Sequence, residues 1–214
     1  MAQKDEPDVE LRVAPQQARA RQAIDAVLEA TGQLLDEVGY DRVTTKAVAA
    51  RAGVNIATLY RYFPDKISLA RALAARYDHQ YGTRLAALLE QVATREDWRS
   101  AVRELIDETI RVRRLQPGME GLRRATPPSD ELQQLQDEVL GGIHRDVAAA
   151  IVHRRPDMAP KDAKVIAIAL TTAVDAVLAL RFGRLSAKQV AAHATDIAVG
   201  YLAPVFDAGN ITPR

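Results

Sequence analysis

Two short helices that cross closely are predicted between Thr44 and Lys66, because a small residue, a glycine and a leucine fall at helix-turn-helix intervals. Ala49 lies four positions before Gly53, and Leu59 follows six positions after it. The small Ala49 leaves room for the second helix, Gly53 can adopt the positive φ of a tight turn, and Leu59 fills the shared core. The second helix is expected from about residue 55 to 62, and DNA is the leading partner for such a unit.

Basic residues are concentrated in the same segment. The whole chain carries a formal net charge of +1, from 29 Lys and Arg residues against 28 Asp and Glu residues. Between positions 42 and 66 five basic residues accompany one acid, a balance of +4, so the remainder sums to −3. The five are Arg42, Lys46, Arg51, Arg61 and Lys66, and the acid is Asp65. A basic face on a mildly acidic body orients a protein on a polyanion.

Composition predicts an all-α protein. Aromatic residues make up 5% of the 214 residues, alanine and leucine are abundant, and β-branched runs are short. The absence of cysteine excludes disulfides and thiolate metal sites and is compatible with a reducing compartment. The first residues lack an apolar signal core, and the apolar stretch at 165–174 is too short for a bilayer. We therefore expect a cytoplasmic protein without membrane association.

Helical periodicity and chain breakers divide the sequence into three parts: a disordered tail at 1–14, a three-helix helix-turn-helix domain at 15–64 and a helical domain at 65–214. Thr44, Asn55 and Asp65 are the expected N-caps of the second, third and fourth helices. The expected helices run from 15 to about 38, 44 to 52, 55 to 62, 66 to about 88, 98 to 116, 119 to 124, 130 to 154, 161 to 182 and 187 to about 206.

The two last helices are expected to form a dimer interface. Apolar residues lie nearly all around the helix at 161–182, so the core of one monomer cannot cover it alone. With the helix at 187–206 it forms an antiparallel pair, and two such pairs make a four-helix bundle.

The segment GYDRVTTKAVAARAGVNIATLYRYFPDK resembles the TetR/AcrR family of bacterial transcriptional repressors. The resemblance covers roughly residues 18–75, where the Gly-Tyr pair, the Thr-Thr pair, the Ala-Gly-Val turn and the Leu-Tyr-x-Tyr-Phe run occur in register. The remaining chain is similar only in helix count and in its apolar final pair. The resemblance implies a homodimeric repressor, not an enzyme, with no cofactor. It also implies a palindromic operator and release by a small-molecule effector bound in the C-terminal domain.

The resemblance also implies which residues contact DNA. Phosphate contacts are expected from the side chains of Thr44, Thr45, Tyr60, Tyr62 and Lys66. Asn55, Thr58 and Arg61 are expected to read bases, and Lys46 is expected near a phosphate or a base edge. The implied DNA-contacting residues are Thr44, Thr45, Lys46, Asn55, Thr58, Tyr60, Arg61, Tyr62 and Lys66. For Tyr62 a packing role is equally open. Arg19 and Arg21 can approach the backbone or minor groove, whereas Arg42 and Arg51 can be solvated surface charges.

An effector site is expected among the helices at 96–116, 130–154 and 161–182, following the same resemblance. Its candidate lining residues are Trp98, Met119, His144, Asp175 and Phe182. Trp98 can equally be ordinary core, and Asp175 can equally pair with an arginine across the dimer. No two histidines have helical metal-ligand spacing, so no metal site is expected. The alternative function is a helical small-molecule carrier whose head binds a protein partner.

Overall fold

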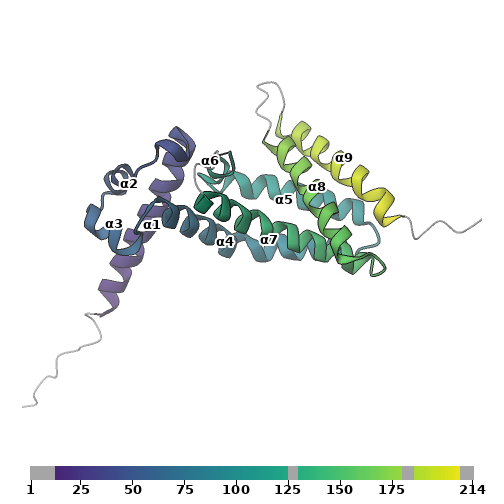
Figure 1. The fold of residues 1–214 in the computed structure, drawn as a ribbon, viewed down its shortest axis with the longest axis horizontal. Helices are drawn as coiled ribbons and strands as arrows, with labels where there is room; N and C mark the ends of the chain where they lie inside the picture. The colour runs from purple at the N-terminus through teal and green to yellow at the C-terminus, as the bar shows by residue number, and fades with distance from the viewer. Residues whose placement is uncertain (1–12, 125–129, 180–185, 208–214) are drawn as a thin grey trace, which may run out of the picture. The chain divides into compact units, whose positions relative to one another are not determined.

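The structure is a computed structural model that describes residues 13–124, 130–179 and 186–207 (Figure 1). These residues form nine α-helices, one 3-10 turn and no strand. The elements are α1 (Val13–Val38), the 3-10 turn η2 (Tyr40–Arg42), α2 (Thr45–Ala52), α3 (Ile56–Tyr62), α4 (Lys66–Thr94), α5 (Trp98–Arg114), α6 (Met119–Arg124), α7 (Asp130–Arg154), α8 (Pro160–Leu178) and α9 (Ala187–Phe206). The all-α expectation is confirmed.

The expected N-caps are confirmed by hydrogen bonds. The Thr44 hydroxyl oxygen accepts from the Ala47 N–H at 3.1 Å, which begins α2. The Asn55 Oδ1 accepts from the Ala57 N–H at 2.8 Å, which begins α3. At α4, Asp65 Oδ1 accepts from the backbone N–H of Ser68 at 2.7 Å. Each cap satisfies a backbone donor that has no partner within its own helix.

The largest difference from the expected helix limits is at α4, which ends at Thr94, about six residues past its expected end. Helix α1 begins at Val13, two residues before the expected start, and α5 ends at Arg114. Helix α8 begins with Pro160 in its first turn, where a missing N–H costs no hydrogen bond. Its expected end at 182 lies outside the described residues, as does most of the expected tail at 1–14.

Backbone contacts group the described residues into two compact units. The first contains 13–73 and 117–124, and the second contains 74–116, 130–179 and 186–207. Residues 65–73 and 117–124 fall in the domain predicted at 65–214, but their backbone contacts group them with the helix-turn-helix. Leu69 and Leu73, on the first turns of α4, are fully buried. Helix α6 joins the first unit by packing against α1.

The contact of α6 with α1 is close enough to require glycine. A Cβ added at Gly32 would lie 2.6 Å from the carbonyl oxygen of Pro117, and one added at Gly121 would lie 2.5 Å from that of Leu35. Gly118, which approaches Gly32 equally closely, has a φ of 85°, a conformation that favours glycine. Backbone therefore meets backbone along this crossing, with no room for a side chain.

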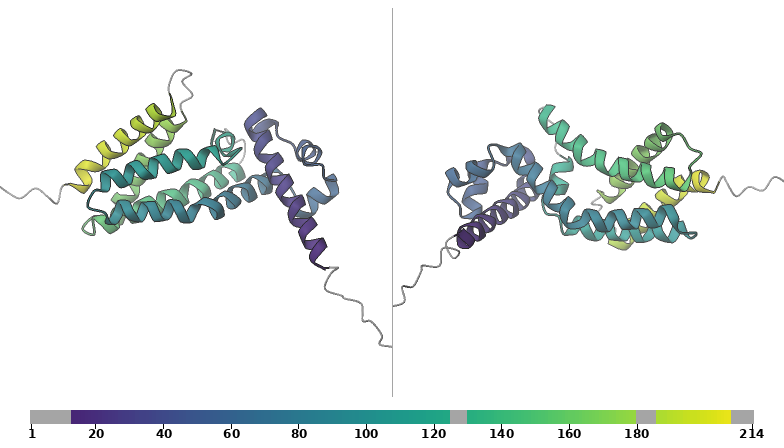
Figure 2. Two further views of the ribbon diagram at one scale, coloured as in Figure 1. Left: turned by 180° about the vertical axis from the view of Figure 1, so that it is seen from behind. Right: turned by 90° about the horizontal axis from the view of Figure 1, so that it is seen from below.

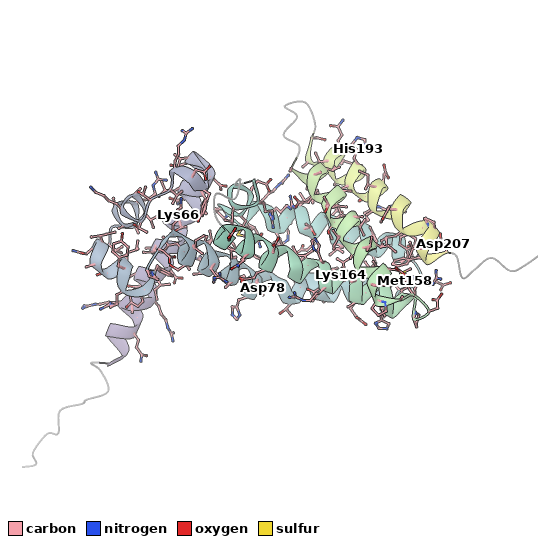
Figure 3. The ribbon with its side chains drawn as sticks, viewed as in Figure 1. Lys66, Asp78, Met158, Lys164, His193 and Asp207 are labelled. Carbon is pink, nitrogen blue, oxygen red and sulfur yellow. The ribbon has the colours of Figure 1, made fainter. Side chains whose placement is uncertain are left out.

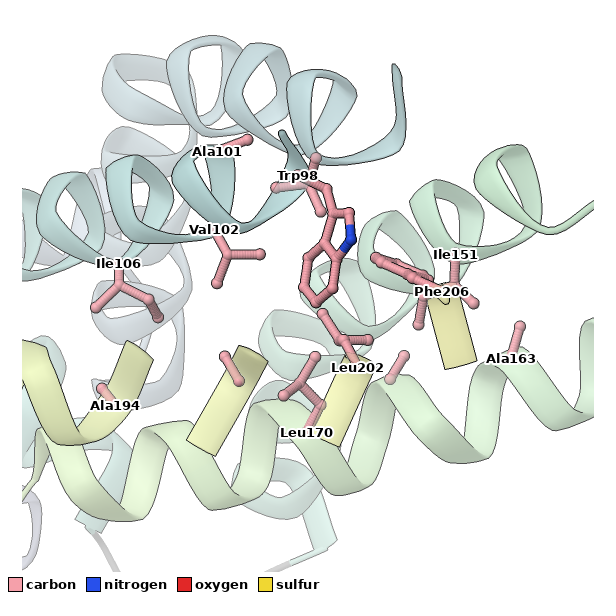
Figure 4. Packing of buried hydrophobic residues seen from close by; sticks show 13 residues of the cluster. Trp98, Ala101, Val102, Ile106, Ile151, Ala163, Leu170, Ala194, Leu202 and Phe206 are labelled. Atoms are coloured by element: carbon pink, nitrogen blue, oxygen red, sulfur yellow. The ribbon is translucent and has the colours of Figure 1, made fainter. Parts of the chain in front are cut away.

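The second unit has a core of small and large apolar residues (Figure 4). Buried alanines, such as Ala101 on α5, Ala167 on α8 and Ala198 on α9, let these helices approach closely. Figures 1 and 2 show α8 and α9 running side by side. At one end of this core the Trp98 ring packs edge-on against the Phe206 ring, with centroids 5.0 Å apart.

Arg154 of α7 closes the end of α4 inside the second unit. Its Nη1 donates to the carbonyl oxygens of Val92 at 3.2 Å and Arg95 at 2.8 Å. The guanidinium also lies 5.2 Å from the centroid of the Phe206 ring. Burial lowers the pKa of Arg154. One side chain thus supplies donors to carbonyls at the end of α4, which have no partner within the helix.

Candidate nucleic-acid interface

The turn between α2 and α3 has the geometry that its spacing predicts. Gly53 has φ 67° and ψ 26°, and its N–H donates to the Ala50 carbonyl at 3.3 Å. The Val54 N–H donates to the Ala49 carbonyl at 3.1 Å, which closes the turn. Ala49 and Leu59 are 3% and 0% exposed, so the small residue and the leucine form the buried crossing.

One side of α3 faces outward, and the helical period shows which residues lie on that side. Leu59 and Phe63 point into the core of the first unit. Each residue turns the helix by about 100°, so Ala57 and Arg61, two positions on either side of Leu59, lie opposite the core. Both are exposed, as are Ile56 and Tyr60 on one flank, whereas Thr58 and Tyr62 on the other are half-buried. Asn55 is exposed at the N-terminus of the helix.

A hydroxyl pair joins α3 to the N-terminus of α2. The Tyr60 hydroxyl lies 2.9 Å from the Thr45 Oγ1, and either oxygen can be the donor. Next to this pair, Thr44 uses its hydroxyl oxygen as an acceptor for the helix cap, so its hydroxyl proton remains available to a phosphate. Lys46 is exposed on the same turn. The structure therefore brings these four predicted residues together on one surface.

Arg61 and Tyr62 also form a pair. The Arg61 Nη2 donates to the Tyr62 hydroxyl at 2.8 Å, and the guanidinium carbon lies 4.8 Å from the Tyr62 ring centroid. The sequence predicts a base contact for Arg61 and either a phosphate contact or packing for Tyr62, but it does not predict this pair.

Lys66 is half-buried, and its ammonium uses one of its donors within the protein. Its Nζ donates to the carbonyl oxygen of Tyr40 at 3.0 Å and lies 4.1 Å from the centroid of the Tyr40 ring. Tyr40 is itself buried in η2, so Lys66 (labelled in Figure 3) ties the first turn of α4 to the turn before α2. The Gly-Tyr pair at 39–40 was the sequence signal for this contact, but the sequence alone did not indicate that Lys66 contacts Tyr40.

The remaining basic residues are all exposed and differ in their pairing. Arg51 donates to Glu37 of α1 at 2.6 Å, and this hydrogen bond lowers the pKa of Glu37. Arg51 is therefore an exposed surface charge that is also ion-paired. Arg19, Arg21 and Arg42 are exposed. Arg51 thus contributes less to the positive face than the local balance of +4 implies.

Comparison with known families identifies both parts of the chain. A model described as bacterial regulatory proteins of the tetR family matches residues 27–73. A second model, described as a tetracyclin repressor-like C-terminal domain, matches residues 97–202. The chain belongs to the TetR family. Its family is one of transcriptional regulators that are generally not enzymes.

Individual relatives agree with this assignment. The transcriptional repressor KstR of Rhodococcus jostii is 48% identical over 50 residues, which cover 23% of this chain and 24% of that protein. A TetR-family regulator from Streptomyces coelicolor is 29% identical with a TM-score of 0.56, covering 86% of this chain and 99% of that one. SmeT of Stenotrophomonas maltophilia, solved with triclosan, is 21% identical with a TM-score of 0.61, covering 83% and 90%. The chain spans about a quarter of the length of the first curated relatives it matches.

The described effector candidates of this TetR-family chain have different surroundings. Trp98 is 2% exposed within the core, and its Nε1 donates to Asp207 at 3.3 Å. Met119 is buried in α6, which belongs to the first unit. Asp175 forms an ion pair with Arg113 of its own chain. The arginine partner is therefore found within the protomer, whereas the sequence suggests one across the dimer. His144 is half-buried on α7, and Phe182 lies outside the described residues.

The second unit contains a buried carboxylate that was not predicted from the sequence. Glu108 on α5 is 7% exposed, accepts from the Arg111 Nη2 at 2.6 Å and forms an ion pair with Arg84 of α4 at 2.5 Å. The hydrogen bonds from Arg111, aided by Arg84, lower the pKa of Glu108. The only sequence signal was the arginine three positions later, a common surface pattern.

Among the described residues, no group of three or more His, Cys, Asp or Glu side chains is placed to hold a metal ion. Within the same residues, no helix has the length and apolar character needed to cross a membrane.

Proposed function

We propose that this protein is a homodimeric transcriptional repressor that binds a palindromic DNA operator and releases it when a small-molecule effector binds. The observation that carries the proposal is the outward face of the helix-turn-helix, where hydroxyl and cationic groups of α2 and α3 lie together. In such dimers the two recognition helices enter successive major grooves about 34–36 Å apart. The operator is then an imperfect palindrome with that spacing.

Phosphate and base contacts divide between the edges and the centre of this face. Thr44, Thr45, Lys46 and Tyr60 are the phosphate contacts on the α2 side, which fix the register of the protein on the duplex. The outward centre of α3 meets base edges in the major groove. Asn55 contributes mainly its amide N–H donors there, because its oxygen already accepts from Ala57. Thr58 reaches the groove from the other flank.

Dimerisation through α8 and α9 is supported by the apolar side chains that one protomer leaves exposed. Val165 and Ile168 of α8 are 64% and 38% exposed, and Ile197 and Tyr201 of α9 are 37% and 42% exposed. On each helix the two residues are three or four positions apart and so share a face. Two α8–α9 pairs packed through these faces make the four-helix bundle that the sequence predicts.

Effector binding belongs to the second unit, among α5, α7 and α8. His144 and Asp175 remain candidates for lining that site, whereas the core position of Trp98 makes it a supporting residue. SmeT was solved with triclosan, a small organic molecule, and a ligand of comparable size is the class we propose here. An effector that prefers a conformation with a different separation of the recognition helices lowers operator affinity by linkage.

Selection of bound genomic fragments, followed by fluorescence anisotropy at two salt concentrations, tests this proposal. We expect one sequence class to bind well above random DNA, with affinity falling steeply as salt rises. If no fragment is retained at either salt concentration while small molecules still bind, the protein is a helical carrier. A cytoplasmic location belongs to the same proposal.

A further inference from the structure

The outward face of α3 contains one small residue and one arginine at its centre. Ala57 and Arg61 are one helical turn apart and lie opposite the buried Leu59. A methyl group at position 57 allows the backbone of α3 to approach the base edges closely. Arg61 is then the long side chain that reaches furthest into the groove from the centre of the helix.

The arginine is held by its neighbour rather than left free. Tyr62 accepts one hydrogen bond from Nη2 at 2.8 Å, and its ring centroid lies 4.8 Å from the guanidinium carbon. A guanidinium has five N–H donors, so four remain after this bond. Holding a flexible side chain in one orientation before binding reduces the entropy lost on contact with DNA.

The two flanks of α3 use their tyrosines differently. The Tyr60 hydroxyl is bonded to Thr45 of α2, so it belongs to the surface that also contains the Thr44 cap and Lys46. The Tyr62 hydroxyl is bonded to Arg61 instead. Of the two phenols, only Tyr62 therefore touches the group at the centre of the reading face.

We propose that Arg61 and Tyr62 form one reading unit for guanine, in which Tyr62 is the positioning residue and Arg61 makes the base contact. This inference rests on the proposed DNA-binding function. Two parallel N–H donors of a fixed guanidinium match the O6 and N7 acceptors that guanine presents in the major groove. No other base offers two acceptors there, so the unit selects a G·C pair at one position of each half-site.

The test uses the full-length protein and a duplex selected from a random library, with each half-site position replaced in turn by the other three bases. We expect the wild type to prefer guanine at one position by about 5- to 150-fold over the other bases. Arg61→Ala removes that preference. Arg61→Lys keeps the positive charge but loses the planar fork of donors, so we expect a weaker guanine preference with a salt dependence close to wild type.

Tyr62→Phe separates positioning from phosphate contact, because it keeps the ring and removes the hydroxyl that holds Arg61. We expect the guanine preference to fall by roughly fivefold, the effect of one lost hydrogen bond. Tyr60→Phe is the matched control, and it weakens binding to every duplex alike without changing the preference. A Tyr62→Phe variant that behaves like Tyr60→Phe overturns the positioning role, and an Arg61→Ala variant with intact guanine preference overturns the reading unit. Failure to select any duplex refutes the proposed function instead.

Discussion

Replacing Lys66 with methionine removes the ammonium that joins α4 to η2 and keeps most of the aliphatic side chain. The ammonium makes a charged hydrogen bond to the Tyr40 carbonyl at 3.0 Å, a class worth about 1.5–3 kcal/mol, and a cation–π contact worth about 0.5–2 kcal/mol. One charge makes both contacts and is only half-buried, so we take a combined loss of about 2 kcal/mol. For a chain of this size that corresponds to a melting temperature lower by about 4–8 °C.

The salt dependence of DNA binding distinguishes this structural role from a phosphate contact. Each lost phosphate contact reduces the slope of log K against log salt by about 0.9, hence by about 1.8 for the two copies in a dimer. If Lys66 acts mainly through Tyr40, the Lys66→Met variant melts earlier but keeps the wild-type slope.

Lys46→Met is the matched control, because Lys46 is exposed on α2 and is a predicted DNA contact. We expect it to lower the slope with little change in melting temperature. Circular dichroism melts and anisotropy titrations at four salt concentrations measure both quantities. A Lys66→Met variant with wild-type stability and a slope reduced as in Lys46→Met would refute the reasoning.

Three further variants test other parts of the structure. Gly121→Ala places a Cβ 2.5 Å from the Leu35 carbonyl, so urea unfolding should show a loss of about 1–3 kcal/mol, and an unchanged midpoint would contradict the close α1–α6 contact. The lowered pKa of Glu108 means that its ion pairs stabilise the fold above the ordinary value of 4.5 and are lost as pH falls through the lower folded value. Glu108→Gln should therefore melt earlier than wild type at pH 7, with the difference shrinking on acidification below 4.5; a constant difference would argue against the ion pair. Val165→Glu adds a charge to a side chain 64% exposed in the protomer. If α8 forms the dimer interface, light scattering should report a monomer and circular dichroism an unchanged helicity. A stable dimer would place the interface elsewhere.

Local features of the fold were predictable because they depend on residues close in sequence. The caps at Thr44 and Asn55 each involve a donor two or three positions away, and the turn at Gly53 depends on a single backbone conformation. Periodicity likewise located α9 at 187–206 without any knowledge of its neighbours. Such signals are complete within one or two helical turns of sequence.

Contacts between distant residues were not predictable in the same way. A long side chain such as that of Lys66 can bond to DNA, solvent or protein, and the sequence pattern around it is the same in each case. The partner of Lys66 becomes evident only from the position of Tyr40 in the fold. The burial of Glu108 depends on where Arg84 of another helix lies. The place of α6 depends on glycines at 32 and 121, whose spacing in sequence has no periodic signature.

The contact of α6 with α1 limits how the DNA-binding head can be transplanted. A fragment ending at Leu73 contains the whole helix-turn-helix but lacks the segment at 117–124, which meets α1 backbone to backbone. Met119 and Leu122, 4% and 2% exposed, are missing from such a fragment, and the side of α1 around Gly32 loses its cover. A chimera that gives this head a new sensor domain therefore has to bring two separate pieces of the parent chain.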